Sequence, residues 1–190
     1  MGFEFELKFR ATPETLEKIR KAYSGGQVIQ METTYYDTPE GSLAEKKFTL
    51  RKRRENGECV CTLKTPGGEQ GRGEFEVLQP DIEKALPELC KLSGEIIPGE
   101  SLMEVCGAKF TRYAKEMTFS DCTLELAADA GVLTGGGKEL PFCEIEVELR
   151  AGSRESVIGF ARTLAESYAL QEEEKSKFKR ALELAKYGRF

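Results

Sequence analysis

The sequence predicts an α+β fold: an eight-stranded antiparallel β-barrel, or tunnel, with a charged lumen and with helices packed outside it and at the C-terminus. Three observations predict this fold. Charged and apolar residues alternate with the period of a strand up to about residue 150, and turn clusters such as Glu55-Asn56-Gly57 separate the alternating segments. After Gly152 the apolar residues take up helical spacing. Short strands in hairpin order with few helices are typical of a barrel or a strongly curved sheet.

The N-terminal half supplies five of these strands and two helices. Alternation predicts the first strand over 3–10. A helix follows, because Thr12 can cap it, Pro13 suits its first position and Gly25-Gly26 can end it. The same patterns predict strands at 27–37, 45–54, 58–65 and 72–78, and a short helix at 81–92.

The C-terminal half supplies three strands and two more helices. Strands are predicted at 104–119, 121–128 and 142–150, with a glycine turn at 135–137 before the last. Ser153 can cap a helix in which Val157 and Leu164 share the apolar face, and a second helix is expected at about 172–187. The chain contains no internal repeat and no low-complexity linker, so we expect residues 1–190 to form a single domain.

Composition narrows the class of protein. The net charge of −5 argues against general nucleic-acid binding, and no apolar run approaches the roughly 20 residues that span a bilayer. The six cysteines include no Cys-x-x-Cys pair, and the N-terminal segment does not look like a secretory signal, so we expect reduced thiols in a cytoplasmic protein. Histidine is absent, which leaves carboxylates, lysine, arginine or metal-bound water for any catalysis.

Most of the predicted strands carry one apolar and one charged face. For a single strand, a charged face is ordinarily one that faces solvent. Here, however, arginine and lysine concentrate on two central strands, as at Arg51, Arg53 and Lys64, whereas glutamate dominates the first strand and the last ones. We therefore expect the charged faces to line a common lumen and the apolar faces to pack against helices.

A lumen of this kind has a natural ligand. Lysine and arginine bind phosphate oxygens, and arginine can do so with two parallel hydrogen bonds. Clustered glutamates repel such an anion unless they hold divalent cations that bridge to it, and Mg²⁺ and Mn²⁺ prefer oxygen ligands. Acidic strands that face basic strands therefore predict a site for metal ions together with a phosphate chain.

Near its start the chain reads Glu4-x-Glu6-x-Lys8, and here it resembles the CYTH, or triphosphate tunnel metalloenzyme, superfamily. Further segments resemble the motifs of that family in the same order and cover nearly the whole chain: 35–38, 50–53, 62–64, 74–76, 111–112, 125–131, 144–148 and 175–180. The resemblance implies an eight-stranded tunnel that acts on triphosphates with Mg²⁺ or Mn²⁺.

The resemblance also implies roles for individual residues. Phosphate oxygens would be contacted by Lys8, Arg51, Arg53, Lys64, Arg112 and Lys177. Metal would be held by Glu4, Glu6, Asp129, Glu144 and Glu146, and the catalytic group would comprise Glu4, Glu6 and Lys8. Supporting roles are implied for Glu74, Glu76, Glu125, Arg72, Glu148 and Arg180.

Among triphosphates we expect inorganic tripolyphosphate to be the substrate, because the connections are short and no insertion is available to recognise a base. The enzymatic alternatives are a class IV adenylate cyclase and a thiamine triphosphatase. A polyphosphate-binding module without catalysis is the alternative from another class, although such a module would need no metal-binding glutamates. Homodimers occur in the family, so a homodimer is compatible with the resemblance.

Overall fold

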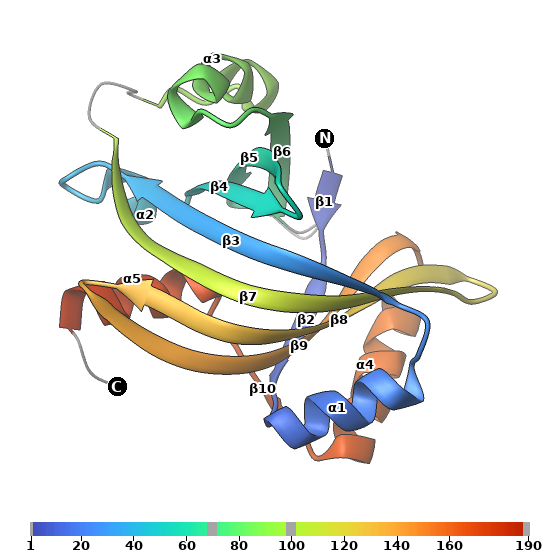
Figure 1. Ribbon diagram of the computed structural model, residues 1–190. Helices are drawn as coiled ribbons and strands as arrows, with labels where there is room; N and C mark the ends of the chain where they lie inside the picture. The colour runs from blue at the N-terminus through green and yellow to red at the C-terminus, as the bar shows by residue number, and fades with distance from the viewer. Residues whose placement is uncertain (1, 68–71, 98–101, 188–190) are drawn as a thin grey trace.

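The computed structural model describes residues 2–67, 72–97 and 102–187, and within them the fold is α+β, as predicted (Figure 1). One antiparallel sheet of ten strands dominates it. The strands are β1 (Gly2–Glu4), β2 (Glu6–Arg10), β3 (Gln27–Asp37), β4 (Thr49–Glu55), β5 (Glu58–Thr65), β6 (Arg72–Leu78), β7 (Met103–Thr118), β8 (Cys122–Gly135), β9 (Lys138–Gly152) and β10 (Gln171–Glu172).

The N-terminal segment lies against both margins of this sheet. The strand order is β1-β6-β5-β4-β3-β7-β8-β9-β2-β10, so β1 pairs with β6 and β2 pairs with β9. Only Phe5 separates β1 from β2, and its carbonyl accepts a hydrogen bond of 2.9 Å from the Leu149 N–H of β9. One segment thus links the two ends of a curved sheet, although its ladder is not a closed cylinder of hydrogen bonds as the predicted barrel would be.

The described residues form five helices: α1 (Pro13–Ala22), α2 (Ser42–Glu45), α3 (Ile82–Ser93), α4 (Arg154–Tyr168) and α5 (Lys177–Tyr187). As predicted, α1, α3 and α4 pack outside the strands, and α5 follows at the C-terminus, where it packs against the cavity side of β7–β9. In Figure 1, α3 lies beside β5 and β6, whereas α1 and α4 lie together near β8 and β9. No helix in the described ranges is long and apolar enough to cross a membrane.

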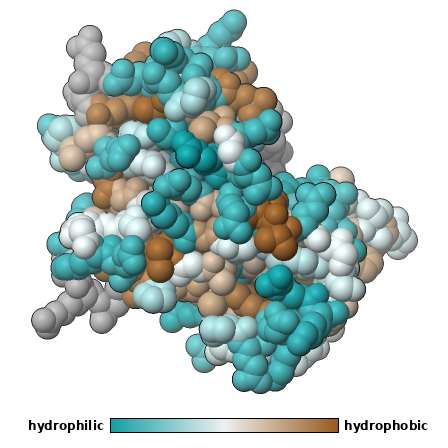
Figure 2. All heavy atoms as spheres, viewed as in Figure 1, coloured by the Kyte–Doolittle hydropathy of each residue, from teal (hydrophilic) through white to brown (hydrophobic). Residues whose placement is uncertain are grey.

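The core is divided into three clusters, each between strands and helices. In the first, Leu124 and Val147 meet Ile19 of α1 and Val157 of α4. The second joins β4–β6 to α3, and the third joins β7–β9 to α5 through Ala181 and neighbouring side chains. In the first two clusters the apolar faces of the strands pack against helices, which leaves the opposite faces for the interior of the curved sheet. The third cluster lies on the interior side, because Phe110 shares its strand face with Arg112 and Phe142 shares its own with Glu144. On the face shown in Figure 2, hydrophilic residues dominate and hydrophobic residues form only small patches.

Several boundaries differ from the prediction. The strand expected at 45–54 begins only at Thr49, because 42–45 form α2. Asp37 stabilises that turn by accepting hydrogen bonds from the N–H groups of Leu43 at 2.8 Å and Ala44 at 3.0 Å. The strands expected at 121–128 and 142–150 are longer, since β8 and β9 continue to the glycine turn. The last helix begins at Lys177 and not at 172, because Gln171 and Glu172 pair with β2 as β10.

Candidate functional site

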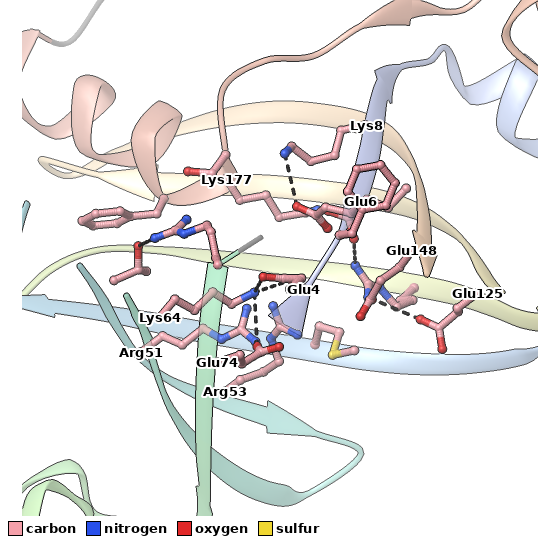
Figure 3. Close-up of a pocket in the computed structure, with 18 of the residues that line it drawn as sticks. Glu4, Glu6, Lys8, Arg51, Arg53, Lys64, Glu74, Glu125, Glu148 and Lys177 are labelled. Carbon is pink, nitrogen blue, oxygen red and sulfur yellow. Dashed lines mark hydrogen bonds and ion pairs between the residues drawn. The ribbon is translucent and has the colours of Figure 1, made fainter. Parts of the chain in front are cut away.

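The interior of the curved sheet contains a large cavity of about 740 Å³. Its lining comes from β1 to β9 and from the start of α5, and most of it is charged (Figure 3). Of the residues predicted to form the site, the cavity is lined by Glu4, Glu6, Lys8, Arg51, Arg53, Lys64, Arg72, Glu74, Glu76, Arg112, Glu125, Glu146, Glu148 and Lys177. The alternation of the strands therefore brings thirteen predicted side chains to one place, and α5 adds Lys177.

Three buried guanidinium groups form the basic centre of the cavity. Arg51 and Arg53 alternate on β4, and Arg112 comes from β7. Burial, followed by the nearby charges of Arg51 and Arg112, lowers the pKa of Arg53 below its ordinary value. Its hydrogen bond to Thr33 Oγ1 is 3.3 Å long, and its nearest carboxylate partner, Glu55, lies 3.6 Å away. Arg53 thus carries a positive charge that nearby carboxylates only partly balance.

Arg51 points to the same conclusion. Its Nη2 lies 3.3 Å from Glu74, but its buried Nε has no hydrogen-bond partner among the described residues. A buried donor without a partner is costly, and an anion in the cavity would satisfy it.

Two lysines that line the cavity are held by glutamates. Lys64 donates to Glu4 at 2.5 Å and lies 3.2 Å from Glu74, as the dashed lines in Figure 3 show. Lys8 donates to Glu6 at 3.2 Å. Burial, together with the charges of Glu146 and Glu4, raises the pKa of Glu6 above its ordinary value. Negative charge is therefore in excess around Glu6, a situation that a divalent cation would relieve.

A second acidic group lies deeper, where β8, β9 and α5 meet. One carboxylate oxygen each from Asp129, Glu144 and Glu146 lies within 4.8 Å of the others. Asp129 and Glu144 sit opposite each other on β8 and β9, and Glu146 follows Glu144 on the same face. Lys177 Nζ reaches all three, at 2.8 Å from Asp129, 2.5 Å from Glu144 and 2.7 Å from Glu146.

Arginines complete the neutralisation of this deeper group. Arg112 contacts Asp129 at 2.8 Å and also Glu146, and Arg180 contacts Glu144. Burial alone would lower the pKa of Lys177, but Asp129, Glu146 and Glu144 raise it well above its ordinary value. In turn, burial would raise the pKa of Glu146, but Lys177 and Arg112 hold it well below. Opposite charges therefore fix both side chains in their ionised forms.

The residues of the cavity fit a divalent metal ion. The donors are carboxylate oxygens, the ligands that Mg²⁺ and Mn²⁺ prefer, and three of them already converge within coordination reach of a common point. Glu4 and Glu6 are not part of that convergent group. The structure thus places the five predicted metal ligands in two neighbouring sets, one facing the cavity and one beneath Lys177.

Three predicted residues lie behind the cavity wall and do not line it: Asp129, Glu144 and Arg180. Asp129 and Glu144 have no exposed surface because Lys177 and the arginines cover them. Arg72 does line the cavity, but its Nη2 donates to Thr49 Oγ1 at 3.3 Å and to the Lys47 carbonyl at 3.2 Å, so it ties β6 to the start of β4.

Sequence reasoning missed several lining residues. Glu55 lies two residues beyond Arg53, and Arg150 lies two residues beyond Glu148, so extending the alternation by one step would have found both. Arg150 contacts Glu148 at 2.7 Å and Glu125 at 2.9 Å. Burial, and then the charges of Glu4, Glu6 and Glu125, raises the pKa of Glu148 to about 7, although Arg150 opposes the shift.

The structure thus defines a class of proteins in which one antiparallel sheet curves around a cavity lined by arginines, lysines and carboxylates. Comparison with known proteins leads to a family with this fold. A family model described as the CYTH domain matches residues 2–182. An inorganic triphosphatase of Haemophilus influenzae is 32% identical over 174 residues, which are 85% of this chain and 49% of that protein. The chain thus spans about half the length of this curated relative.

Solved structures share the fold. A putative adenylate cyclase from Bacillus halodurans superposes with a TM-score of 0.69 at 19% identity, covering 94% of this chain and 96% of the other. A putative adenylyl cyclase from Hippeastrum, described as having a dominant triphosphatase activity, superposes with a TM-score of 0.67 at 20% identity, covering 99% and 97%. This chain belongs to the CYTH domain family.

Proposed function

We propose that the protein hydrolyses a phosphoanhydride bond of a triphosphate with the help of Mg²⁺ or Mn²⁺, and that its substrate is inorganic tripolyphosphate. The observation that carries the proposal is the guanidinium group of Arg53, whose pKa is lowered by burial and then by the charges of Arg51 and Arg112, together with the buried Arg51 Nε, which has no hydrogen-bond partner among the described residues. A chain of phosphates supplies several negative charges and many acceptor oxygens at this point. The triphosphatase of Haemophilus influenzae supports the reaction class.

The basic side chains would bind the phosphate chain and stabilise charge during transfer. Positioning and electrostatic stabilisation dominate phosphoryl transfer, so little other chemistry is demanded of the protein. The phosphate oxygens would be contacted by Lys8, Arg51, Arg53, Lys64, Arg112 and Lys177. Lys64 and Lys8 would exchange their present glutamate partners for phosphate oxygens.

The carboxylates would hold the metal ions. Glu4 and Glu6, released from Lys64 and Lys8, would act as ligands at the cavity surface, and Asp129, Glu144 and Glu146 form the second set of oxygens. A bound divalent cation neutralises phosphate charge and lowers the pKa of a coordinated water. Supporting contacts are proposed for Glu74, Glu76, Glu125, Arg72, Glu148 and Arg180.

Tripolyphosphate is preferred because charged side chains dominate the lining. One observation favours an organic triphosphate as a second candidate: Ile29 and Met31 of β3 give the cavity a short apolar strip, against which a base or a thiamine ring could pack. On that reading the protein would be a class IV adenylate cyclase or a thiamine triphosphatase. A module that only binds polyphosphate is disfavoured, because binding alone requires no paired carboxylates.

The test is a panel that measures phosphate release from tripolyphosphate, thiamine triphosphate and ATP, each with Mg²⁺ and with Mn²⁺. Replacing Arg53 with Gln should lower kcat/KM for tripolyphosphate by at least about 100-fold, the scale of losing one charge-stabilising donor. The matched control is Arg54→Gln, because Arg54 is the next residue on β4 and is exposed on the other face.

The panel also separates the alternatives. Metal-dependent turnover should disappear when Glu4 and Glu6 are both changed to Gln, and full activity in that variant would refute the site. Faster turnover of ATP than of tripolyphosphate, with cyclic AMP as product, would replace the proposal by the cyclase. Tight tripolyphosphate binding without any turnover would favour the binding module. The single domain over 1–190, the homodimer and the cytoplasmic location stay predictions.

A further inference from the structure

A buried carboxylate outside the cavity connects the N-terminal strand to the last helix. Glu173 lies between β10 and α5, and only 4% of its surface is exposed. It accepts hydrogen bonds from Arg10 Nε at 2.7 Å and from the Lys175 N–H at 3.0 Å, and it lies 3.6 Å from Arg180 Nη1. Its own N–H donates to the Lys8 carbonyl of β2 at 2.8 Å.

Burial of a carboxylate is costly unless ionic and hydrogen-bonding partners compensate it. Burial alone would raise the pKa of Glu173, but Arg10, the Lys175 N–H and Arg180 hold it below its ordinary value. Without these contacts the Glu173 carboxylate would be a buried charge with no compensation, and without Glu173 its partners would lose their shared anion. The function proposed for the cavity assigns no role to Glu173.

The beginning of α5 needs an anion from outside the helix. Its first four residues include Lys177, Lys179 and Arg180, and none is acidic. Positive charge at a helix N-terminus opposes the helix dipole and is unfavourable. The carboxylates that offset it belong to other segments, namely Glu144 of β9 and Glu173 of the connection.

Contacts continue from Glu173 to the cavity without a gap. Arg180 lies one turn after Lys177, so both side chains are on one face of α5. Arg180 faces Glu173 on one side and contacts Glu144 on the other, and Glu144 in turn accepts from Lys177 at 2.5 Å. Lys177 is the only side chain of α5 proposed to touch phosphate, and its position depends on where the helix begins.

We propose that Glu173 is a positioning residue that fixes the start of α5 against β2 and thereby holds Lys177 in the cavity. The inference rests on the proposed function only for the effect on catalysis, since the fixing of α5 is a property of the fold. Glu173 touches neither the cavity nor any proposed metal ligand, so it acts through Arg180 and the helix.

The test compares Glu173→Gln with Glu172→Gln, because Glu172 is the preceding residue and is exposed. Two readouts are measured on the full chain: Michaelis kinetics with tripolyphosphate and Mg²⁺, and hydrogen exchange of the backbone amides of 177–187. E173Q should raise KM about tenfold with a smaller change in kcat, and should speed exchange in the first turns of α5 at least tenfold. Exchange in β8 and β9 should not change, and E172Q should match the wild type in both readouts.

Unchanged exchange in α5 of E173Q, or a KM within twofold of wild type in an active enzyme, would overturn the inference. Uniformly faster exchange throughout the chain would also overturn it, because that result describes general destabilisation. If the wild type hydrolyses no triphosphate, the proposed function fails, and the exchange readout alone still decides whether Glu173 fixes α5. Should E173Q fail to fold, Arg10→Gln weakens the same contact from the exposed partner and should give the same changes at smaller size.

Discussion

Replacement of Lys177 by Met tests how strongly the deep carboxylates depend on one ammonium group. Lys177 is 6% exposed and lies within 2.8 Å of an oxygen of Asp129, Glu144 and Glu146. Met has a similar unbranched length, so the variant removes the charge, and with it the cation–π contact to Phe142, while it keeps an apolar side chain of comparable reach. Breaking a buried ion pair by removing one partner costs about 3–5 kcal/mol, because the other charge stays buried.

We therefore expect K177M to lower the free energy of unfolding by about 3–5 kcal/mol, measured by urea denaturation in EDTA so that no divalent cation replaces the ammonium. Lys186→Met is the control, since Lys186 is exposed near the end of the same helix, and it should change stability by no more than about 0.5 kcal/mol. Adding Glu144→Gln to K177M should recover about 1 kcal/mol or more, because it removes one of the stranded charges.

The reasoning would be refuted if K177M were as stable as the Lys186 control. It would also be refuted if Glu144→Gln lowered the free energy of unfolding by the same amount in K177M as it does in the wild type. Either result would mean that the carboxylates are not electrostatically coupled to Lys177, despite their distances.

Three further predictions concern packing and ligand binding. Gly131→Ala should lower the free energy of unfolding by about 2 kcal/mol or more in a thermal melt, because the added Cβ would lie 2.1 Å from the Lys109 carbonyl oxygen. Gly159→Ala in α4 is the control and should be neutral or stabilising, since its Cβ would meet no atom within 4 Å. Equal effects of the two changes would contradict the prediction. Leu63→Ala should lower the free energy of unfolding in urea by about 2–5 kcal/mol, since Leu63 has no exposed surface, and a loss below about 1 kcal/mol would argue against the packed second cluster. Tripolyphosphate at about 100 times its dissociation constant, with Mg²⁺ present, should raise the free energy of unfolding by about 2.7 kcal/mol, measured by calorimetry. EDTA should remove the part of this stabilisation that depends on the metal. An unchanged unfolding temperature would argue against a specific site.

Much of the site could be predicted from the sequence because a strand sends every second side chain to the same side. Arg51 and Arg53, or Glu144 and Glu146, are assigned to one face by the period alone. The curved sheet then turns these faces inward, so that Arg51, Arg53 and Glu146 line one cavity and Glu144 lies behind its wall. Glu55 was missed because the predicted strand ended at residue 54, whereas Arg150 lay inside the predicted strand 142–150 and was simply not assigned to the site.

Features that depend on distant contacts could not be predicted. The role of Glu173 depends on its ion pair with Arg10, which is 163 positions away in the sequence. The helix at 42–45 is too short to show helical spacing, and Asp37 supports it from the preceding strand. The division of the first strand into β1 and β2, with separate partners, likewise depends on where β6 and β9 lie.

The pairing of the N-terminal segment has a consequence for the order of folding. Leu7 of β2 pairs with Val147 of β9, so β2 is synthesised well before the strand with which its ladder forms. Contacts between residues so far apart in sequence slow folding, because a long loop must close first. Until β9 emerges from the ribosome, β2 has an unpaired edge, and such edges invite association between nascent chains. Its alternating charges at Glu6, Lys8 and Arg10 would discourage that association during the wait.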